Sequence, residues 1–188
     1  MIKKRFALAL LPLLLAGSFE GLEAQSAKLF GVTGGATYTG FSSYSRGSKM
    51  GGIFGVTAGV RQWNWTVINV EASWAQRGAD GVDLDHVDVP LLFGGSSDLG
   101  NGVRVRGYTG IQVGYNISCN STVVGVNCSR INKWQWAWPV GLQIGKYRSG
   151  GNFIAADVRY AWFLNDAFDN LISNQRGWEF KLILGKAR

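Results

Sequence analysis

The stretch KWQWAWPVGLQIGK, residues 133–146, has a tryptophan at every second position of its first half. Successive side chains of a β-strand point to opposite faces, whereas at helical spacing Trp134, Trp136 and Trp138 would scatter around the axis. The even positions continue as aliphatic residues to Ile144, and the odd positions hold lysine, glutamine, alanine, proline and glycine. The stretch therefore predicts a strand with one apolar face and one small or polar face.

The same period of two recurs along the chain, as in TVINVEASWAQR at 66–77, FIAADVRYAWF at 153–163 and GWEFKLILG at 177–185. After residue 24 no segment shows the 3.6-residue apolar repeat of an amphipathic helix. An all-β protein is therefore expected. Its eight predicted strands lie near residues 28–40, 51–62, 65–77, 83–95, 103–116, 133–147, 152–164 and 177–186.

The predicted connections alternate in character along the chain. One set of short connections comprises Asn64 and its neighbours, SSDLGNG at 96–102 and RSGG at 148–151. The other set is mostly longer and more polar, and comprises residues 41–50, 78–82, 117–132 and 165–176. Short turns on one rim and long loops on the other are typical of an antiparallel up-and-down barrel in a bacterial outer membrane. With eight strands, both chain ends fall on the short-turn rim.

The volume of the barrel decides which face points inward. Eight strands enclose little more than their own side chains. The polar face is rich in glycine, whereas the apolar face carries most of the large aromatic residues, which would overfill the lumen. We therefore expect the aromatic face to meet lipid. From Trp134 to Ile144 a tilted strand spans about 25 Å of membrane. The tryptophans expected in an aromatic girdle are Trp134, Trp136, Trp138, Trp162 and Trp178.

The start of the chain predicts export. Lys3, Lys4 and Arg5 precede the apolar run FALALLPLLLAG at 6–17, which is too short to span a bilayer, and Ala24 ends a plausible cleavage site. We therefore interpret residues 1–24 as a signal peptide and residues 25–188 as one barrel domain. The formal net charge is +7. Because the basic residues are scattered through strand-like segments, they favour lipopolysaccharide or anionic lipid over nucleic acid as a partner.

The inward face predicts a network of charges. Its members are Arg61, Glu71, Asp88, Arg104, Arg106, Asp157, Arg159, Glu179 and Lys181. The same inward face holds Arg77, His86, Gln112 and Gln143. A charge inside a narrow barrel is costly unless it is paired. We therefore expect each of the four carboxylates to meet an arginine or lysine on a neighbouring strand. The resulting interior would be filled, because eight strands leave little room for a conducting path.

Cys119 and Cys128 are the only cysteines, and both fall in the predicted loop 117–132. Export places them in an oxidising compartment, so we expect a disulfide that ties this loop. A metal site is disfavoured because two cysteines without a nearby histidine leave the coordination incomplete.

His86 is the only histidine and bears on the possibility of catalysis. It has Asp88 on the same strand and Ser73 available, but these residues do not define a nucleophile–base–orienter arrangement. We expect a lumen histidine that is hydrogen-bonded to Asp88 or Arg104. No catalytic residue, cofactor or metal ligand is predicted.

Four segments carry a resemblance to a known family: VEASWAQRGA at 70–79, LDHVDVPLLF at 84–93, VRGYTGIQVGYNIS at 105–118 and VRYAWFLNDAFDN at 158–170. With these segments the chain resembles the small outer-membrane β-barrels of Gram-negative bacteria, of the PorT-like or porin-family type. The resemblance covers nearly all of the chain after residue 24. It implies an eight-stranded transmembrane barrel without a defined enzymatic activity.

Three functions are therefore compatible with the sequence. The first is a non-enzymatic outer-membrane barrel with a structural or surface-interaction role. Its expected partners are outer-membrane lipid, lipopolysaccharide, the barrel assembly machinery and an extracellular protein that contacts loop 117–132. The second is an enzyme that modifies lipid A and uses His86. The third is an exported soluble barrel that binds an apolar ligand.

Overall fold

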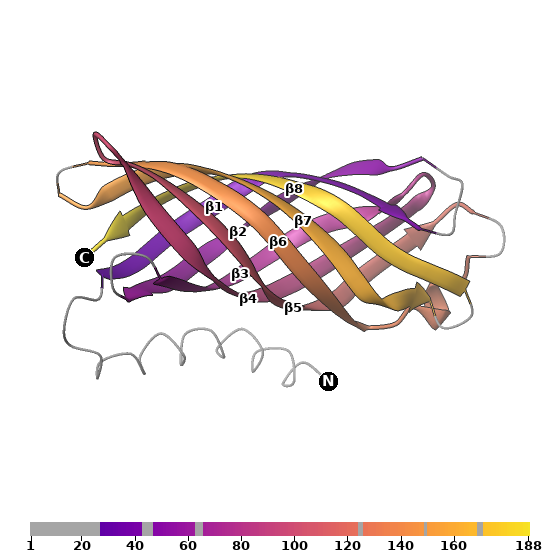
Figure 1. Cartoon of the computed structure of the whole chain (residues 1–188). Coiled ribbons are helices and arrows are strands. Elements are labelled where there is room, and N and C mark those ends of the chain that lie inside the picture. Colours follow the sequence, from indigo (N-terminus) through magenta and orange to yellow (C-terminus); the bar gives the residue numbers. More distant parts are fainter. Residues whose placement is uncertain (1–26, 43–46, 63–65, 124–125, 149, 169–170) are drawn as a thin grey trace, which may run out of the picture.

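Eight antiparallel strands form a closed barrel in which consecutive strands pair and β1 also pairs with β8 (Figure 1). The computed structural model describes residues 27–42, 47–62, 66–123, 126–148, 150–168 and 171–188. The predicted signal peptide, residues 1–24, lies outside this part of the chain. The strands are β1 (Ala27–Phe41), β2 (Lys49–Gln62), β3 (Thr66–Ala79), β4 (Val82–Gly100), β5 (Val103–Ser121), β6 (Trp134–Tyr147), β7 (Asn152–Phe168) and β8 (Leu171–Ala187).

The start of β1 and the end of β8 meet at one rim of the barrel (Figure 1). There the N–H of Lys28 donates to the carbonyl of Arg188 at 2.7 Å, and the N–H of Arg188 donates back to Lys28 at 2.9 Å. We call this rim the termini rim and the opposite one the loop rim. Closure leaves no strand edge unpaired, as a barrel in hydrocarbon requires.

Several strands are longer than the sequence pattern predicted, and the predicted alternation of connection lengths is partly wrong. The segment 96–102 is mostly strand, because β4 and β5 continue to a two-residue turn at Asn101 and Gly102. Both turn residues have positive φ, 52° and 73°, which Asn–Gly adopts readily in tight hairpins. At the loop rim, the predicted loop 78–82 is also a tight turn, at Asp80 and Gly81. The strands continue through these polar segments because they extend beyond the apolar band of the barrel. There both faces of a strand can be polar, so polar residues do not mark the end of the strand.

The longest connection lies at the loop rim, between the end of β5 and the start of β6. It is shorter than the predicted loop 117–132 because β5 continues to Ser121. Its described part holds one short 3-10 helix, η2 (Cys128–Arg130), whose N-cap Asn127 accepts a hydrogen bond from the N–H of Ser129.

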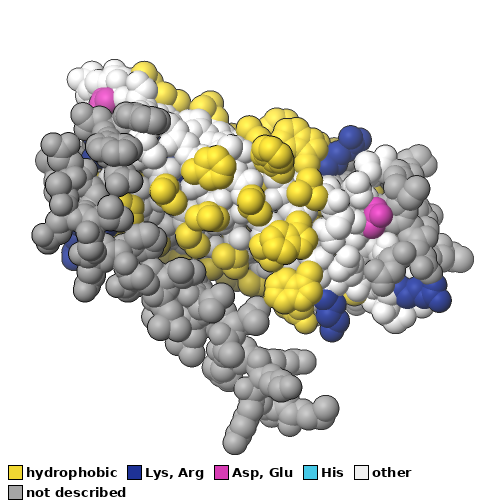
Figure 2. Space-filling model, turned by 60° about the horizontal axis from the view of Figure 1, so that its bottom comes forward, with side chains coloured by type: hydrophobic (Ala, Val, Ile, Leu, Met, Phe, Trp, Pro, Cys, Tyr) yellow, Lys and Arg dark blue, Asp and Glu magenta, His cyan; other side chains and the backbone are white. Residues whose placement is uncertain are grey.

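Exposure alternates along β6 and confirms the predicted faces of the opening stretch. Trp134, Trp136 and Trp138 are about half exposed on the outside, whereas Gln135 and Ala137 are buried inside. On the face shown in Figure 2, the apolar side chains gather across the middle of the barrel, with lysine and arginine beyond one edge of this band. Among the described residues, no helix has the length and apolar character needed to cross a membrane.

Pro90 and Pro139 interrupt the sheet locally, as expected of residues that cannot donate a ladder hydrogen bond. The β3–β4 register skips from the Val70–Leu91 pair to the Ser73–Asp88 pair, and the β5–β6 register has a similar gap beside Pro139. The register is the same on both sides of each gap. The prolines therefore weaken the pairing without making a bulge.

Candidate functional site

The middle of the lumen is filled by charged side chains that meet across the barrel. Glu71 on β3 accepts from Arg159 Nη2 on β7 and from Lys181 Nζ on β8, both at 2.8 Å. Asp157 lies 3.7 Å from Arg159 and 3.8 Å from Lys181. All four side chains are buried. One carboxylate thus holds together strands from opposite sides of the barrel.

Tyr108 belongs to this layer, although the sequence analysis did not single it out. Its hydroxyl donates to Asp157 at 2.6 Å and accepts from Arg159 Nε at 3.1 Å. The ring packs so closely against Gly141 on β6 that a methyl group there would overlap it. Tyr108 follows the inward-facing Arg104 and Arg106 at the same parity, and this parity is the signal that could have identified it.

A second charged layer lies toward the loop rim and centres on Arg77. Its Nη2 atom is 2.6 Å from both Asp88 Oδ2 and Glu179 Oε1, and its guanidinium lies 5.1 Å above the ring of Phe163. Glu179 is also 3.6 Å from Arg159 and from Lys181. Glu179 therefore joins the two layers into one network.

We predicted that each carboxylate meets an arginine or lysine on a neighbouring strand, and this prediction is wrong for Glu71. Asp88 on β4 does meet Arg77 on the adjacent β3. Glu179 on β8 and Asp157 on β7 also meet cations on each other's adjacent strand, Arg159 at 3.6 Å and Lys181 at 3.8 Å, and Glu179 reaches Arg77 on β3 as well. Glu71, however, finds both of its cations across the barrel on β7 and β8. The lumen of an eight-stranded barrel is narrow enough for long side chains to reach the far wall.

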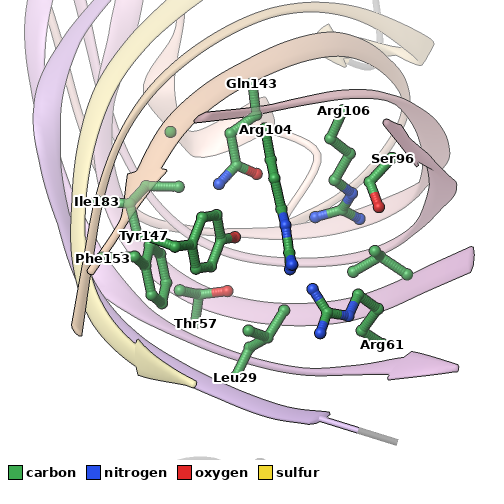
Figure 3. Close-up of a pocket in the computed structure, with 12 residues that line it drawn as sticks. Leu29, Thr57, Arg61, Ser96, Arg104, Arg106, Gln143, Tyr147, Phe153 and Ile183 are labelled. Atoms are coloured by element: carbon green, nitrogen blue, oxygen red, sulfur yellow. The ribbon is translucent and has the colours of Figure 1, made fainter. Parts of the chain in front are cut away.

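Arg61 and Arg104 lie apart from the Glu71 and Arg77 layers, whereas Arg106 borders the Glu71 layer and interacts electrostatically with Glu71 and Asp157. All three arginines lie near the termini rim. They line a cavity at the termini rim, shown in Figure 3. Arg104 contacts Asp98 at 3.3 Å and lies 5.0 Å from the centre of the Tyr147 ring, and Arg106 lies 5.0 Å above the ring of Tyr108. The predicted charge network is therefore divided between the middle of the lumen and its mouth.

His86 is fully buried in the lumen, but its partners differ from those predicted. Nδ1 is 3.8 Å from Asp88 Oδ1, beyond hydrogen-bond distance. Within the described residues neither ring nitrogen has a hydrogen-bond partner, so the predicted bonds to Asp88 or Arg104 are wrong. The ring instead packs edge-on against Phe163 at 6.1 Å. Strand parity predicts that His86 faces the lumen. It does not predict that Phe163, on another strand, packs beside the His86 ring.

An apolar cluster closes the lumen above the charged layers at the loop rim. It is formed by Phe41, Ala79, Val82, Leu84, Val123, Ala167 and Phe168. Cys119 packs against this cluster and forms the predicted disulfide with Cys128, with a Cα–Cα distance of 5.7 Å. The disulfide is confirmed, although Cys119 lies within β5 and only Cys128 lies in the connection. The cross-link ties the end of β5 to the connection that contributes Val123.

The five tryptophans predicted for the girdle all lie on the outer face, with exposed fractions between 44% and 55%. Trp138 is paired in register with Trp162, and Trp178 stacks edge-on with Tyr160 at 4.9 Å. Tyr115 packs in the same way against Trp134. These tryptophan and tyrosine rings therefore gather on the loop-rim side of the apolar band. No group of three or more histidine, cysteine or acidic side chains in the described ranges could hold a metal ion.

Comparisons with known proteins agree with this architecture. Neisserial surface protein A (NspA) has a TM-score of 0.57 and 14% sequence identity, over 87% of this chain and 97% of that chain. The N-terminal beta-barrel domain of Pseudomonas aeruginosa OprF has a TM-score of 0.50 and 13% identity, over 87% and 97% of the two chains. OprG from Pseudomonas aeruginosa also has a TM-score of 0.50, with 10% identity over 86% and 95%. At such low sequence identities, these comparisons show a shared fold alone.

A comparison with curated proteins finds no match. Residues 23–169, however, match the family described as outer membrane protein beta-barrel domain. This match spans most of the chain and confirms the resemblance to small outer-membrane barrels. The protein therefore belongs to the outer membrane protein beta-barrel domain family and is located in the outer membrane.

Proposed function

We propose that the protein is a closed, non-enzymatic outer-membrane barrel that acts at the cell surface through its loop rim. The observation that carries this proposal is the filled lumen. Two joined layers of ion pairs occupy its middle, and an apolar cluster covers them at the loop rim. A solute would have to break buried ion pairs to pass, which costs several kcal/mol per uncompensated charge.

The burial of His86 supports the absence of lipid A-modifying activity. Its side chain is 0% exposed and points into the lumen, as does the buried Ser73, whereas acyl chains contact the outer face. A general base must reach the proton that it abstracts. We expect lipid A from cells that express the His86→Ala variant to match lipid A from wild-type cells by mass spectrometry. A change in acylation that depends on His86 would contradict the proposal.

The loop rim carries exposed cations beside its outward-facing aromatic residues. Lys133 directly precedes Trp134, and Arg176 is paired in register with Trp162. Both side chains are exposed next to these tryptophans. Arginine and lysine bind phosphate by charge-assisted hydrogen bonds. We therefore take lipopolysaccharide as the partner of this rim.

The double variant Lys133→Gln/Arg176→Gln tests this contact. We expect it to bind lipopolysaccharide about tenfold more weakly than wild type, because each exposed charge contributes up to about 1 kcal/mol. The matched control is Lys146→Gln/Lys186→Gln, whose exposed lysines lie at the termini rim. Binding can be measured by calorimetry on the detergent-solubilised barrel. An equal loss in the control would show that only net charge matters.

A further inference from the structure

The cavity has a volume of about 30 Å³ and lies at the termini rim, where β1 begins and β8 ends. Three arginines from two strands line it: Arg61 on β2, and Arg104 and Arg106 on β5. Their guanidinium groups surround one space in Figure 3, where Arg61 and Arg104 point toward each other. A volume near 30 Å³ holds about two waters, or one group of similar size.

The charge of this lining is one-sided. Among the described residues that line the cavity there are three arginines and no carboxylate. Asp98 contacts Arg104 through Nε at 3.3 Å, but its side chain is 54% exposed and lies outside the cavity. Like charges that converge in one cavity repel one another, and a bound anion would offset that repulsion.

Thr57 supplies a second, independent observation. It lines the cavity and is 7% exposed, and within the described part of the chain its hydroxyl oxygen has no hydrogen-bond partner. The hydroxyl points toward the space between the arginines (Figure 3). A buried polar group without a partner is costly, and an acceptor placed in the cavity would remove that cost.

We propose that this cavity is a binding site for one oxyanion group, a carboxylate or a phosphate, on a small solute of the periplasm. Arg61 and Arg104 would hold the charge by paired N–H donors, and the Thr57 hydroxyl would donate the third hydrogen bond. Leu29, Phe153 and Ile183 close the sides of the cavity with apolar groups, which strengthens the interaction by excluding water. The ion pairs of Glu71 and Asp157 lie deeper in the lumen, so the solute enters and leaves from the termini rim.

The site is independent of the contact proposed for the loop rim, because the two lie at opposite ends of the barrel. Its test is calorimetric titration of the purified, detergent-solubilised barrel with inorganic phosphate and, separately, with acetate at constant ionic strength. Phosphate binding alone would identify a phosphate group, and acetate binding alone would identify a carboxylate. We expect a single site for at least one of the two.

Two variants and a control locate the site. Arg61→Gln removes a charge-assisted contact and is expected to weaken binding about tenfold. Thr57→Val keeps the shape of the side chain and removes one neutral hydrogen bond, for an expected loss of about fivefold. Lys146→Gln removes an exposed, outward-facing charge at the same rim and should leave affinity unchanged. A heat-modifiable band on an unboiled gel shows that each variant is folded. Absence of binding for both anions, or an equal loss in Lys146→Gln, would overturn the proposal.

Discussion

Glu71 is buried in the lumen, and its two cations belong to strands on the far side of the barrel. Arg159 and Lys181 each lie 2.8 Å from one of its oxygens. Ion pairs withdrawn from water gain little over apolar packing, but removal of one partner leaves the others buried and uncompensated. The network is therefore more sensitive to the loss of one member than an exposed pair would be.

The Glu71→Gln variant tests this sensitivity. We expect it to lower the free energy of unfolding by about 3–5 kcal/mol, because it leaves Arg159 and Lys181 buried without their shared carboxylate. Denaturant titration of the barrel in lipid vesicles provides the measurement. Asp98→Asn is the matched control, since its ion pair with Arg104 is exposed and should cost less than about 1 kcal/mol. Equal losses for the two variants would show that the lumen charges are solvated.

The sequence predicted which side chains face the lumen, but it did not predict which other side chains they contact there. Parity along one strand places Glu71 and Glu179 inside, and the structure agrees. Which residues of opposite strands share a level depends on the tilt and stagger of all eight strands, and this information is not local. The same limit explains why the predicted hydrogen-bond partners of His86 were wrong.

At the scale of the strand, β6 shows how the alternation of side chains determines which face meets lipid, and how the type of outward residue varies along the strand. Its tryptophans lie toward the loop rim, its aliphatic residues continue downward, and Lys146 follows beyond them. The faces of the strand were predictable because the apolar and small positions alternate strictly. Strand ends were less predictable: the polar segment 96–102 reads as a loop, yet it pairs as far as the turn at Asn101 and Gly102.

The depth of β6 can be measured by placing an arginine on its lipid face. Val140 lies near the midpoint between Trp134 and Ile144, and all three point outward. We expect Val140→Arg to cost about 2–4 kcal/mol of stability in vesicles, whereas Ile144→Arg, near the interface and Lys146, should cost less than about 1 kcal/mol. Equal costs at the two positions would contradict the assigned depth. A stable Val140→Arg barrel in detergent would show that lipid causes the difference.

At the scale of the whole molecule, the barrel has three levels. An apolar cluster with the Cys119–Cys128 disulfide closes the loop rim, ion pairs fill the middle, and an arginine-lined cavity opens at the termini rim. The fold, its closure and its membrane face followed from composition and alternation. The division of the charges into an ion-paired middle and an arginine-lined mouth did not, because each arginine has the same sequence signature wherever its partners lie.

The closed lumen is the central claim, and planar-bilayer recording of the purified protein tests it most directly. We predict no steady conductance, because ion passage would require the pairs around Glu71 and Arg77 to separate. A double variant that replaces both members of one pair, Arg77→Met with Asp88→Leu, should also remain silent if the lumen stays filled. Steady, reproducible conductance steps from the wild-type barrel would contradict the account.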